Sequence, residues 1–367
     1  MQDHITPRRV VILGGGFAGL FAARALRRSR VAVTVADRRA RRLFQPLLCQ
    51  CASGILSEGQ IAQPLRGVLR RHLNVRCALA EATDVDADAR LVRARRPGGG
   101  IVHPPYDDLS VAVGMRQSCF GRDEFAAHAP GMKTLDGALD IRRRIHRAFE
   151  TAETAAKLHP GTMVTDIDAH GLTVRDHDGR TTRFGARTVW WTAGVEAPPI
   201  AAALARATGA EQDRAGRILV EPDLTLLGHP EIRVTGDVTS LSRLPGPAEV
   251  GMRSGTYAGR SVRHAVEARA KQPNPFRYVD LGSAAYTARG RAVVKAGPLC
   301  LSGFTGRRAW LFNRLAFLTG FRSRLGAVLG WSVAFATGSR RERAFTMPDT
   351  DASAALASGS KPPPPPP

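Results

Sequence analysis

The sequence is poor in lysine and in acidic residues, and this shortage limits its binding partners. Only five of the 53 basic residues are lysine, and the 32 acidic residues leave a formal net charge of +21. Such a charge raises nucleic acid or an anionic membrane surface as a partner. The arginines are scattered along the chain and form no single basic run, so we expect no nucleic-acid partner.

Disulfide, metal and targeting signals are scarce as well. The five cysteines are odd in number and lack the spacing of a disulfide framework, which is typical of a reducing compartment. The ten histidines show no metal-ligand spacing. Residues 1–9 are short and polar, so we expect no signal peptide and a protein that begins in the cytoplasm.

One glycine-rich turn dominates the N-terminal part of the chain. The apolar residues 10–13 have the pattern of a strand buried on both faces, and they lead into Gly14, Gly16 and Gly19. The first glycine of this G-x-G-x-x-G spacing allows a tight turn, the second a close approach of a pyrophosphate, and the third close packing of helix on strand. The N-terminus of the following helix would hold the phosphates. The motif therefore predicts a dinucleotide site.

A second strand completes this fingerprint. Residues 31–36 have the pattern of a buried strand, and Asp37 follows it 18 residues beyond Gly19. An acid in this position binds ribose hydroxyls. We expect the site to include Asp37, its neighbour Arg38, and Phe17 and Ala18 within the motif. The fingerprint itself leaves FAD and NAD as alternatives.

The stretch after Arg38 is more specific than the glycines. It contains Leu-Phe-Gln-Pro-Leu-Leu at residues 43–48. This segment resembles the type II NADH:quinone oxidoreductases, single-chain flavoenzymes of the membrane surface that are related to the pyridine nucleotide-disulfide reductases. The resemblance implies that the nucleotide is FAD, with Asp37 on the adenosine ribose and Gln45 and Pro46 near the isoalloxazine. It also implies NAD(P)H as a co-substrate and a quinone or another electron acceptor.

Three later motifs extend this resemblance. In the family, a strand ending in Ala-x-Gly passes the cofactor, which points to Gly114, and a strand ending in Gly-Asp contacts the ribityl chain, which points to Asp237. As plain chemistry, Asp237 is only an acid at the end of a strand, and the alternative is an N-cap of the next segment. The family's next helix points its N-terminus at the flavin, where its dipole stabilises an anionic reduced flavin. Here this helix begins with Glu249 and carries Arg253 in place of the usual glutamines, so an i,i+4 ion pair is expected.

Two closely spaced cysteines raise the question of a redox pair. Cys49 and Cys51 lie where disulfide-reductase relatives place a dithiol. A single intervening residue strains a ring disulfide and puts the side chains on opposite sides of an extended chain. We favour two buried small apolar residues.

A second nucleotide-binding unit is missing. In the related enzymes the helix expected at 136–153 leads into another strand-GxGxxG-helix unit, which binds NADH. Here the chain passes directly into a strand at 162–167, and a βαβ unit needs ~30 residues. The surviving strands are expected at 162–167, 172–175, 181–184 and 188–194, with Trp190 and Trp191 in the core. Their open edges would be covered by a second copy of the chain, by a rearrangement, or not at all.

The C-terminal third combines aromatic residues with arginine. The longest uncharged run of this region, residues 325–339, is shorter than the ~20 residues that a spanning helix needs. Arginine-rich helices with Trp, Phe and Leu on the other face lie in the interface of an anionic membrane. An ordinary basic helix packed on its own domain is the alternative. We expect peripheral association with the inner face of the cell membrane.

These patterns predict an α/β protein with a Rossmann-type FAD-binding domain, made of a βαβ unit and an antiparallel excursion at 75–102. We place its two parts at 1–153 and 226–272, a truncated second dinucleotide-binding domain at 154–225, an amphipathic helical region at 273–345 and a proline-rich tail at 346–367. The function expected from the resemblance is an FAD-dependent NADH dehydrogenase with an impaired NADH site. The alternatives are a non-catalytic flavin-binding relative and an NAD-binding protein without flavin.

Overall fold

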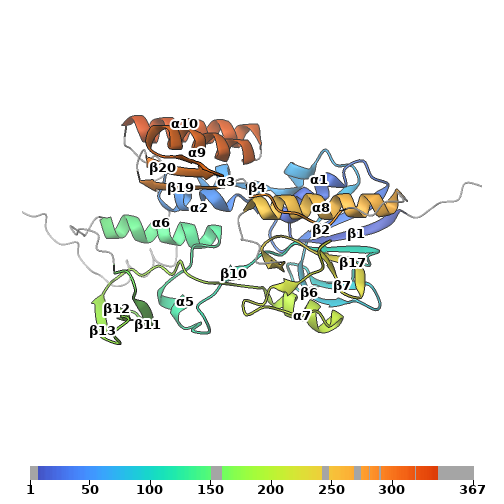
Figure 1. Cartoon of the computed structure of the whole chain (residues 1–367), viewed down its shortest axis with the longest axis horizontal. Helices are drawn as coiled ribbons and strands as arrows, with labels where there is room; N and C mark the ends of the chain where they lie inside the picture. The colour runs from blue at the N-terminus through green and yellow to red at the C-terminus, as the bar shows by residue number, and fades with distance from the viewer. Residues whose placement is uncertain are drawn as a thin grey trace, which may run out of the picture.

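A computed structural model describes residues 7–149, 159–241, 248–267, 274–280, 282–288, 291–318 and 320–337. A six-stranded sheet lies at the centre of the nucleotide-binding part (Figure 1). Its order is β16 (Thr225–Leu226), β17 (His229–Val234), β9 (Asp108–Val111), β1 (Arg8–Leu13), β2 (Val31–Asp37) and β5 (Val75–Leu79). All pairings are parallel except that of β16 with β17. The predicted α/β fold class is confirmed.

The two faces of β1 contact different layers. Val10 and Ile12 pack on one side against α1 (Phe17–Ala25) and α8 (Ala248–Val266). Val11 and Leu13 pack on the other side against β6 (Glu81–Asp86), β7 (Leu91–Arg95) and α7 (Pro199–Thr208), as Figure 1 shows. Because both faces of β1 are covered, its apolar run is unbroken.

The antiparallel excursion is smaller than predicted. It consists of β6, β7 and β8 (Ile101–Val102), whereas β5 pairs with β2 in the parallel sheet. The acidic stretch at 84–88 is typical of a turn, but strand β6 occupies most of it. Val85 is 3% exposed and lies between the exposed Asp84 and Asp86. The acidic residues Asp84, Asp86 and Asp88 therefore masked the pattern of a strand that is buried on one face only.

A second core joins segments that are far apart in the sequence. It contains α2 (Leu48–Ala52), α6 (Leu135–Phe149), α9 (Gly303–Phe317), α10 (Phe321–Thr337) and strand β20 (Arg291–Ala296). Trp310 and Trp331 lie in it with ring centroids 5.8 Å apart, and Trp331 Nε1 donates to Gln50 Oε1 at 2.6 Å. The sheet of β19 (Ser283–Ala288), β20 and β21 (Leu299–Leu301) was not foreseen.

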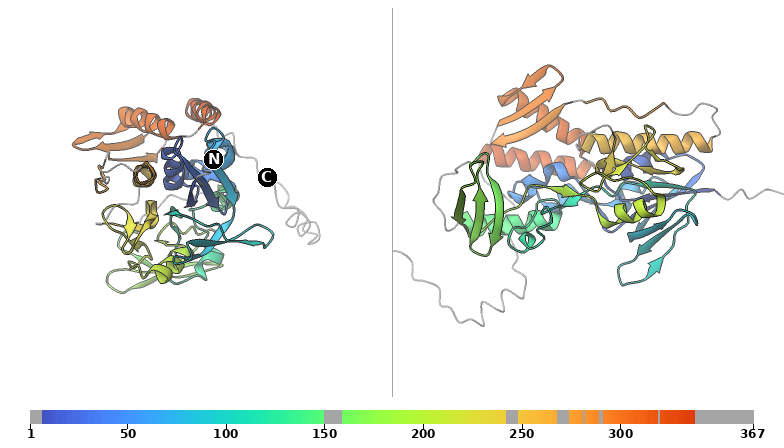
Figure 2. Two further views of the ribbon diagram at one scale, coloured as in Figure 1. Left: turned by 90° about the vertical axis from the view of Figure 1, so that its right-hand side faces the viewer. Right: turned by 60° about the horizontal axis from the view of Figure 1, so that its bottom comes forward.

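The segment expected as a truncated domain forms a separate three-stranded sheet. Its strands are β11 (Met163–Asp168), β12 (Gly171–Arg175) and β13 (Thr181–Gly185), and Figure 2 shows them in green beside α6. The strand expected at 188–194 is wrong, because only a single bridge between Trp191 and Gly131 forms there. A strand needs a hydrogen-bonded neighbouring strand, and within the described residues this segment has only that one bridge.

The aromatic residues of this segment are only partly in a core. Trp190 is 41% exposed, so the core prediction is wrong for it. Trp191 is half-buried and packs on Phe125, with ring centroids 5.9 Å apart. Phe125 is 2% exposed and begins α5 (Phe125–His128). Residues 338–367, which include the predicted tail, lie outside the described residues, and the domain boundaries remain predictions.

Candidate functional site

Three strands of the main sheet end at one edge, and a glycine follows each of them. Gly14 follows β1, Gly114 follows β9, and Gly236 follows β17, with φ angles of +98°, +66° and +79°. Helices α1 and α8 begin at the same edge, because Gly251 in the first turn of α8 contacts Phe17 and Gly236. The carboxyl edge of a parallel sheet is where such folds bind nucleotides.

The glycine turn packs tightly against main-chain atoms at Gly14 and Gly19 and faces free space at Gly16. A Cβ at Gly14 would overlap the carbonyl oxygen of Ala112, and one at Gly19 would overlap that of Gly14. A Cβ at Gly16 would meet no atom within 4 Å. The turn therefore packs tightly on the sheet and leaves free space in front of the N–H groups that open α1, which fits a pyrophosphate.

Asp37 lies at this turn, as the fingerprint predicts. Its Oδ2 accepts the N–H of Gly15 at 2.5 Å, and its Oδ1 accepts the N–H of Arg39 at 2.6 Å. These bonds fix the carboxylate between β2 and the turn, and each oxygen keeps a lone pair for a ribose hydroxyl. Arg38 points to Glu81, with Nη1 and Oε1 3.6 Å apart.

Phe17 and Ala18 have different contacts at the start of α1. The ring of Phe17 packs on Phe44, with centroids 5.6 Å apart, and under the guanidinium of Arg42 at 4.6 Å. Ala18 is 5% exposed and lies against Gly236 and α8. Phe17 thus connects the turn to the segment that carries Gln45 and Pro46, which form the 3-10 helix η1 (Gln45–Leu47).

Asp237 lies opposite a lysine that the sequence did not single out. Its Oδ2 is 3.9 Å from Nζ of Lys133, whose carbonyl oxygen accepts Nε2 of Gln45 at 3.1 Å. Burial raises the pKa of Asp237, and the positive charge of Lys133 opposes that shift. The expected residues Gln45 and Asp237 are therefore brought together through Lys133. No local pattern marks Lys133, because only the fold places it there.

Hydrogen bonds and an ion pair hold the start of α8 in place. Ser254 Oγ accepts the N–H of Gly236 at 3.1 Å and donates to the carbonyl oxygen of Val250 at 2.7 Å. The expected ion pair forms, with Arg253 Nε 3.0 Å from Oε1 of Glu249. Glu249 is thus engaged in the first turn of the helix rather than free to act alone.

A pocket adjoins this site on the side of the truncated segment. Its volume is about 330 Å³, and Lys133 contributes to both the pocket and the ion pair with Asp237. The other lining residues are Gln117, Met132, Thr192, Gly194 and Val195. Gln117 Nε2 donates to the carbonyl oxygens of Ala193 at 2.7 Å and Gly194 at 3.0 Å, which holds the two walls together.

The two neighbouring cysteines form no disulfide with each other. Cys49 and Cys51 both lie on α2, with Cys49 exposed and Cys51 buried. The expectation of two buried residues is therefore wrong for Cys49. Residues two apart on a helix point in different directions, so the pair is not arranged as a dithiol.

Comparison with known proteins identifies the class of protein that carries this site. Residues 8–155 match the family described as pyridine nucleotide-disulphide oxidoreductase. The chain is 36% identical to the type II NADH:quinone oxidoreductase NdhA of Mycobacterium tuberculosis, over 92% of this chain and 89% of that protein. It is 35% identical to Ndh of the same organism, over 92% and 90%. The chain belongs to the type II NADH:quinone oxidoreductase family, as its motifs indicated.

Solved structures agree on the fold. NDH2 from Plasmodium falciparum in complex with NADH superimposes with a TM-score of 0.79 at 15% identity, over 90% of this chain and 99% of that chain. The sulfide:quinone oxidoreductase of Aquifex aeolicus gives a TM-score of 0.70 at 14% identity, over 90% and 96%. The family is FAD-dependent, which decides between the two cofactors that the fingerprint left open.

The relatives are longer than this chain. The alignment with NdhA spans 420 positions, whereas the chain has 367 residues, so part of that relative has no counterpart here. Between the end of α6 at Phe149 and the start of β11 at Met163 lie only residues 150–162. That connection is too short for the ~30 residues of a βαβ unit.

Proposed function

We propose that this protein is an FAD-dependent oxidoreductase that takes electrons from NAD(P)H and passes them to a quinone. The observation that carries this proposal is the convergence of three strand ends and two helix N-termini on the open space at Gly16. Free N–H groups and two positive dipole ends suit the two phosphates of a dinucleotide. FAD supplies the redox chemistry when bound, and the protein supplies binding and orientation.

The residues at this edge have distinct roles in the proposal. The turn from Gly14 to Gly19 receives the pyrophosphate, and Asp37 accepts from ribose hydroxyls. Asp237 accepts from hydroxyls of the ribityl chain, and Lys133 offsets its charge at 3.9 Å. Gly114 gives room beside the cofactor, because a Cβ there would meet no atom within 4 Å.

Helix α8 and the segment of η1 frame the flavin ring in this proposal. The N-terminus of α8, at Glu249, stabilises negative charge that develops near it on reduction. Gln45, which is fixed by Lys133, and Pro46 line the opposite side. The Glu249–Arg253 pair replaces the glutamines expected at the quinone contact, so the acceptor side of this chain differs chemically from the family pattern.

The binding site for the electron donor is incomplete in this chain. We place NAD(P)H in the pocket that Lys133, Gln117 and Gly194 line, next to the site of Asp237. Because residues 150–162 leave no room for a second nucleotide-binding unit, we propose that NADH binds weakly. The same observation favours a second candidate, a flavin-binding protein that does not react with NADH.

Anaerobic reduction separates the two candidates. The purified protein should show the absorbance of bound flavin, and NADH should bleach it at millimolar rather than micromolar concentration. Bleaching by dithionite but not by any concentration of NADH or NADPH would support the non-catalytic candidate. A correctly folded protein that takes up no FAD in excess would contradict both.

The C-terminal helices support a peripheral place at the membrane. Exposed apolar side chains on α9 and α10 include Phe304, Phe312, Leu325, Val328 and Leu329, at 66%, 76%, 47%, 39% and 58%. None of the helices in the described part of the chain has the length and apolar character to cross a bilayer. We propose that this face rests on the inner side of the cell membrane, with arginines toward anionic lipid. A homodimer that covers the open strand edges of the truncated segment stays a prediction, to be tested by sedimentation.

A further inference from the structure

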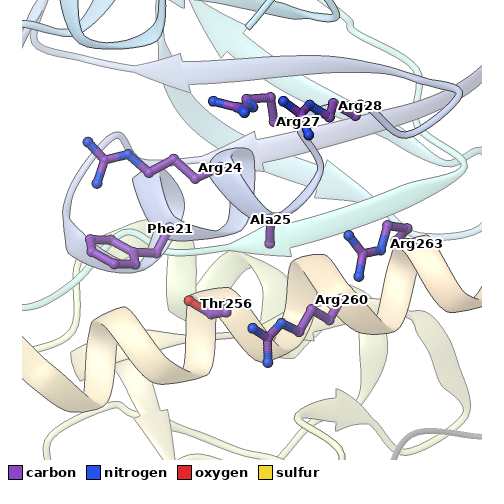
Figure 3. Close-up of a pocket in the computed structure, with 8 residues that line it drawn as sticks. All are labelled: Phe21, Arg24, Ala25, Arg27, Arg28, Thr256, Arg260 and Arg263. Carbon is purple, nitrogen blue, oxygen red and sulfur yellow. The ribbon is translucent and has the colours of Figure 1, made fainter.

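A cavity of about 430 Å³ lies between α1 and α8, away from the cofactor site. Figure 3 shows the residues that line it, which come from α1, from the turn after α1 and from α8. Its lining residues are Phe21, Arg24, Ala25, Arg27, Arg28, Thr256, Arg260 and Arg263. Five of these eight are arginine. Arg24, Arg27 and Arg28 lie at or just beyond the C-terminal end of α1, whereas the glycine turn precedes its N-terminus. Arg260 and Arg263 lie on α8.

The charge in this cavity is barely neutralised within the described residues. Arg263 Nε lies 3.9 Å from Oε1 of Glu267, and the other four arginines have no carboxylate partner there. Arg24 instead lies over the ring of Phe21 at 5.2 Å. Like charges at this density repel one another, so an anion between them would relieve the repulsion.

Two more arginines extend the cluster. Burial and the charge of Arg324, on α10, lower the pKa of Arg24. Burial and the charge of Arg24 lower the pKa of Arg42 to about 10. The charge of Arg324, a residue of α10, therefore acts on the cavity residue Arg24.

We propose that this cavity binds a phosphate-bearing anion. The guanidinium group is a planar fork that matches two phosphate oxygens, and several forks from two helices can hold one phosphate from different sides. The volume is in the ~300–1,000 Å³ range of small-molecule sites. Such a phosphate has two sources, the headgroup of an anionic phospholipid and a soluble phosphate compound.

The site is separate from the dinucleotide cradle. Helix α1 spans nine residues, which at ~1.5 Å per residue puts its two ends ~13 Å apart. The cradle uses backbone N–H groups of a glycine turn, whereas the cavity presents side chains only. FAD can therefore occupy the first while the second remains available.

A pair of matched variants tests the proposal in the flavin-loaded full chain. The cavity variant is Arg24→Gln with Arg260→Gln, one change on each helix. The control is Arg206→Gln with Arg214→Gln, two exposed arginines at and beyond the end of α7, on the other face of the main sheet. Both variants lose two positive charges. Arg260→Gln alone changes an exposed side chain and serves if the double variant fails to fold.

Two binding assays distinguish the sources. Inorganic pyrophosphate is titrated by calorimetry at constant ionic strength, with FAD already bound so that the cradle is filled. Sedimentation with phosphatidylcholine vesicles containing phosphatidylglycerol is compared with vesicles in which oleate supplies the same charge. We expect the cavity variant to lose about tenfold or more in affinity, which is the effect of ~1.4 kcal/mol, and the control to lose little.

The results of the two assays support or overturn the proposed phosphate site as follows. Loss of pyrophosphate affinity in the cavity variant alone supports a soluble phosphate ligand. Loss of binding to phosphatidylglycerol vesicles alone, without a matching loss on oleate vesicles, supports a lipid headgroup. Equal behaviour of the cavity and control variants in both assays overturns the proposal. The flavin absorbance of each sample reports separately on the proposed oxidoreductase function.

Discussion

Gly255 of α8 lies against the main chain of Ala18 in α1, with no space between them for a methyl group. Gly251 and Gly259 lie one turn before and one turn after it, and a Cβ at Gly259 would be 2.6 Å from the carbonyl oxygen of Ala22. Three glycines four residues apart form one face of a helix, which lets two backbones meet. This contact holds the start of α8 beside the glycine turn.

Gly255→Ala should therefore damage both the fold and the site. The added methyl group meets backbone, which cannot rotate away, so the helices must separate. We expect the free energy of unfolding to fall by about 3 kcal/mol, the upper end of overpacking costs, and bound FAD to decrease. Thermal unfolding and the flavin content measure both. Gly59→Ala in α3 (Glu58–Ile61) is the control, since its Cβ would meet no atom within 4 Å. Equal stability of the two variants would contradict this packing.

Gly16→Ala should separate cofactor binding from folding. Gly16 has φ −69°, which alanine adopts, and its Cβ would enter the open space in front of α1. We expect a loss of at most about 1 kcal/mol in stability, from the changed N-cap. The FAD affinity, measured by quenching of flavin fluorescence, should fall by about tenfold or more. Gly14→Ala is the contrast, because its φ of +98° and its contact with Ala112 should prevent folding. Unchanged FAD binding in Gly16→Ala would place the pyrophosphate elsewhere.

Asp237→Asn should stabilise the flavin-free protein at neutral pH. Burial raises the pKa of Asp237 above its ordinary 3.8 in the folded state. Below pH 3.8 the carboxyl is protonated in both states and its contribution to stability is fully present, and that contribution is lost as the pH rises through the raised value. The variant should therefore be more stable than the parent at pH 7, by a margin that shrinks on acidification. Its FAD affinity should fall, because the amide oxygen of asparagine accepts hydrogen bonds from the ribityl hydroxyls more weakly than a carboxylate does.

Chemical denaturation across this pH range measures the effect. Asp88→Asn changes an exposed carboxylate and should leave the stability unaltered. A margin for Asp237→Asn that does not depend on pH would assign the effect to shape rather than charge.

The nucleotide-binding half was readable from the sequence because its signals are local. The apolar run before Gly14, the spacing to Gly19 and the acid at Asp37 each follow from backbone sterics or strand burial, and the structure places them together. The helix from Ala248 was expected as well, and its Glu249–Arg253 pair forms as the i,i+4 spacing implies.

The parts that failed depend on partners distant in sequence. Residues 188–194 have strand propensity but no neighbouring strand, so tertiary context overrides the local signal. Lys133 reaches Asp237 only because the residues before α6 and the turn after β17 meet at the site. The glycines of α8 at positions 251, 255 and 259 are a local signal that also predicts a close helix contact. Their four-residue spacing marks a close helix pair once a partner such as Ala18 is known.

Thiol reactivity should follow exposure and show no disulfide. Cys49 and Cys300 are exposed, whereas Cys51 and Cys119 are buried and Cys77 is half-buried. We expect two thiols to react in the native protein and all five after denaturation without reductant. Cys49 should react more slowly than Cys300, because burial raises the pKa of the Cys49 thiol. Cys49→Ser and Cys300→Ser should each remove one reactive thiol. Recovery of only three thiols on denaturation would reveal a Cys49–Cys51 disulfide and restore the dithiol hypothesis.

The exposed apolar side chains of the C-terminal helices should matter for vesicle binding and not for folding. Phe312 on α9 is 76% exposed and Leu329 on α10 is 58% exposed, so Phe312→Ser with Leu329→Ser removes little from the core. Full burial of such side chains is worth ~1.5–3 kcal/mol each, so insertion at the membrane interface should make the double variant bind vesicles about tenfold or more weakly. The thermal unfolding temperature should stay the same.

Sedimentation with phosphatidylcholine and phosphatidylglycerol vesicles at high salt isolates this apolar contribution, because salt screens the attraction of the arginines. Leu73→Ser with Leu227→Ser is the control, since these side chains are 100% and 81% exposed and lie outside α9 and α10. Both variants lose two apolar side chains, and only the first changes the proposed membrane face. An equal loss of binding in the two would mean that exposed apolar area in general, rather than the face of α9 and α10, holds the protein at the bilayer.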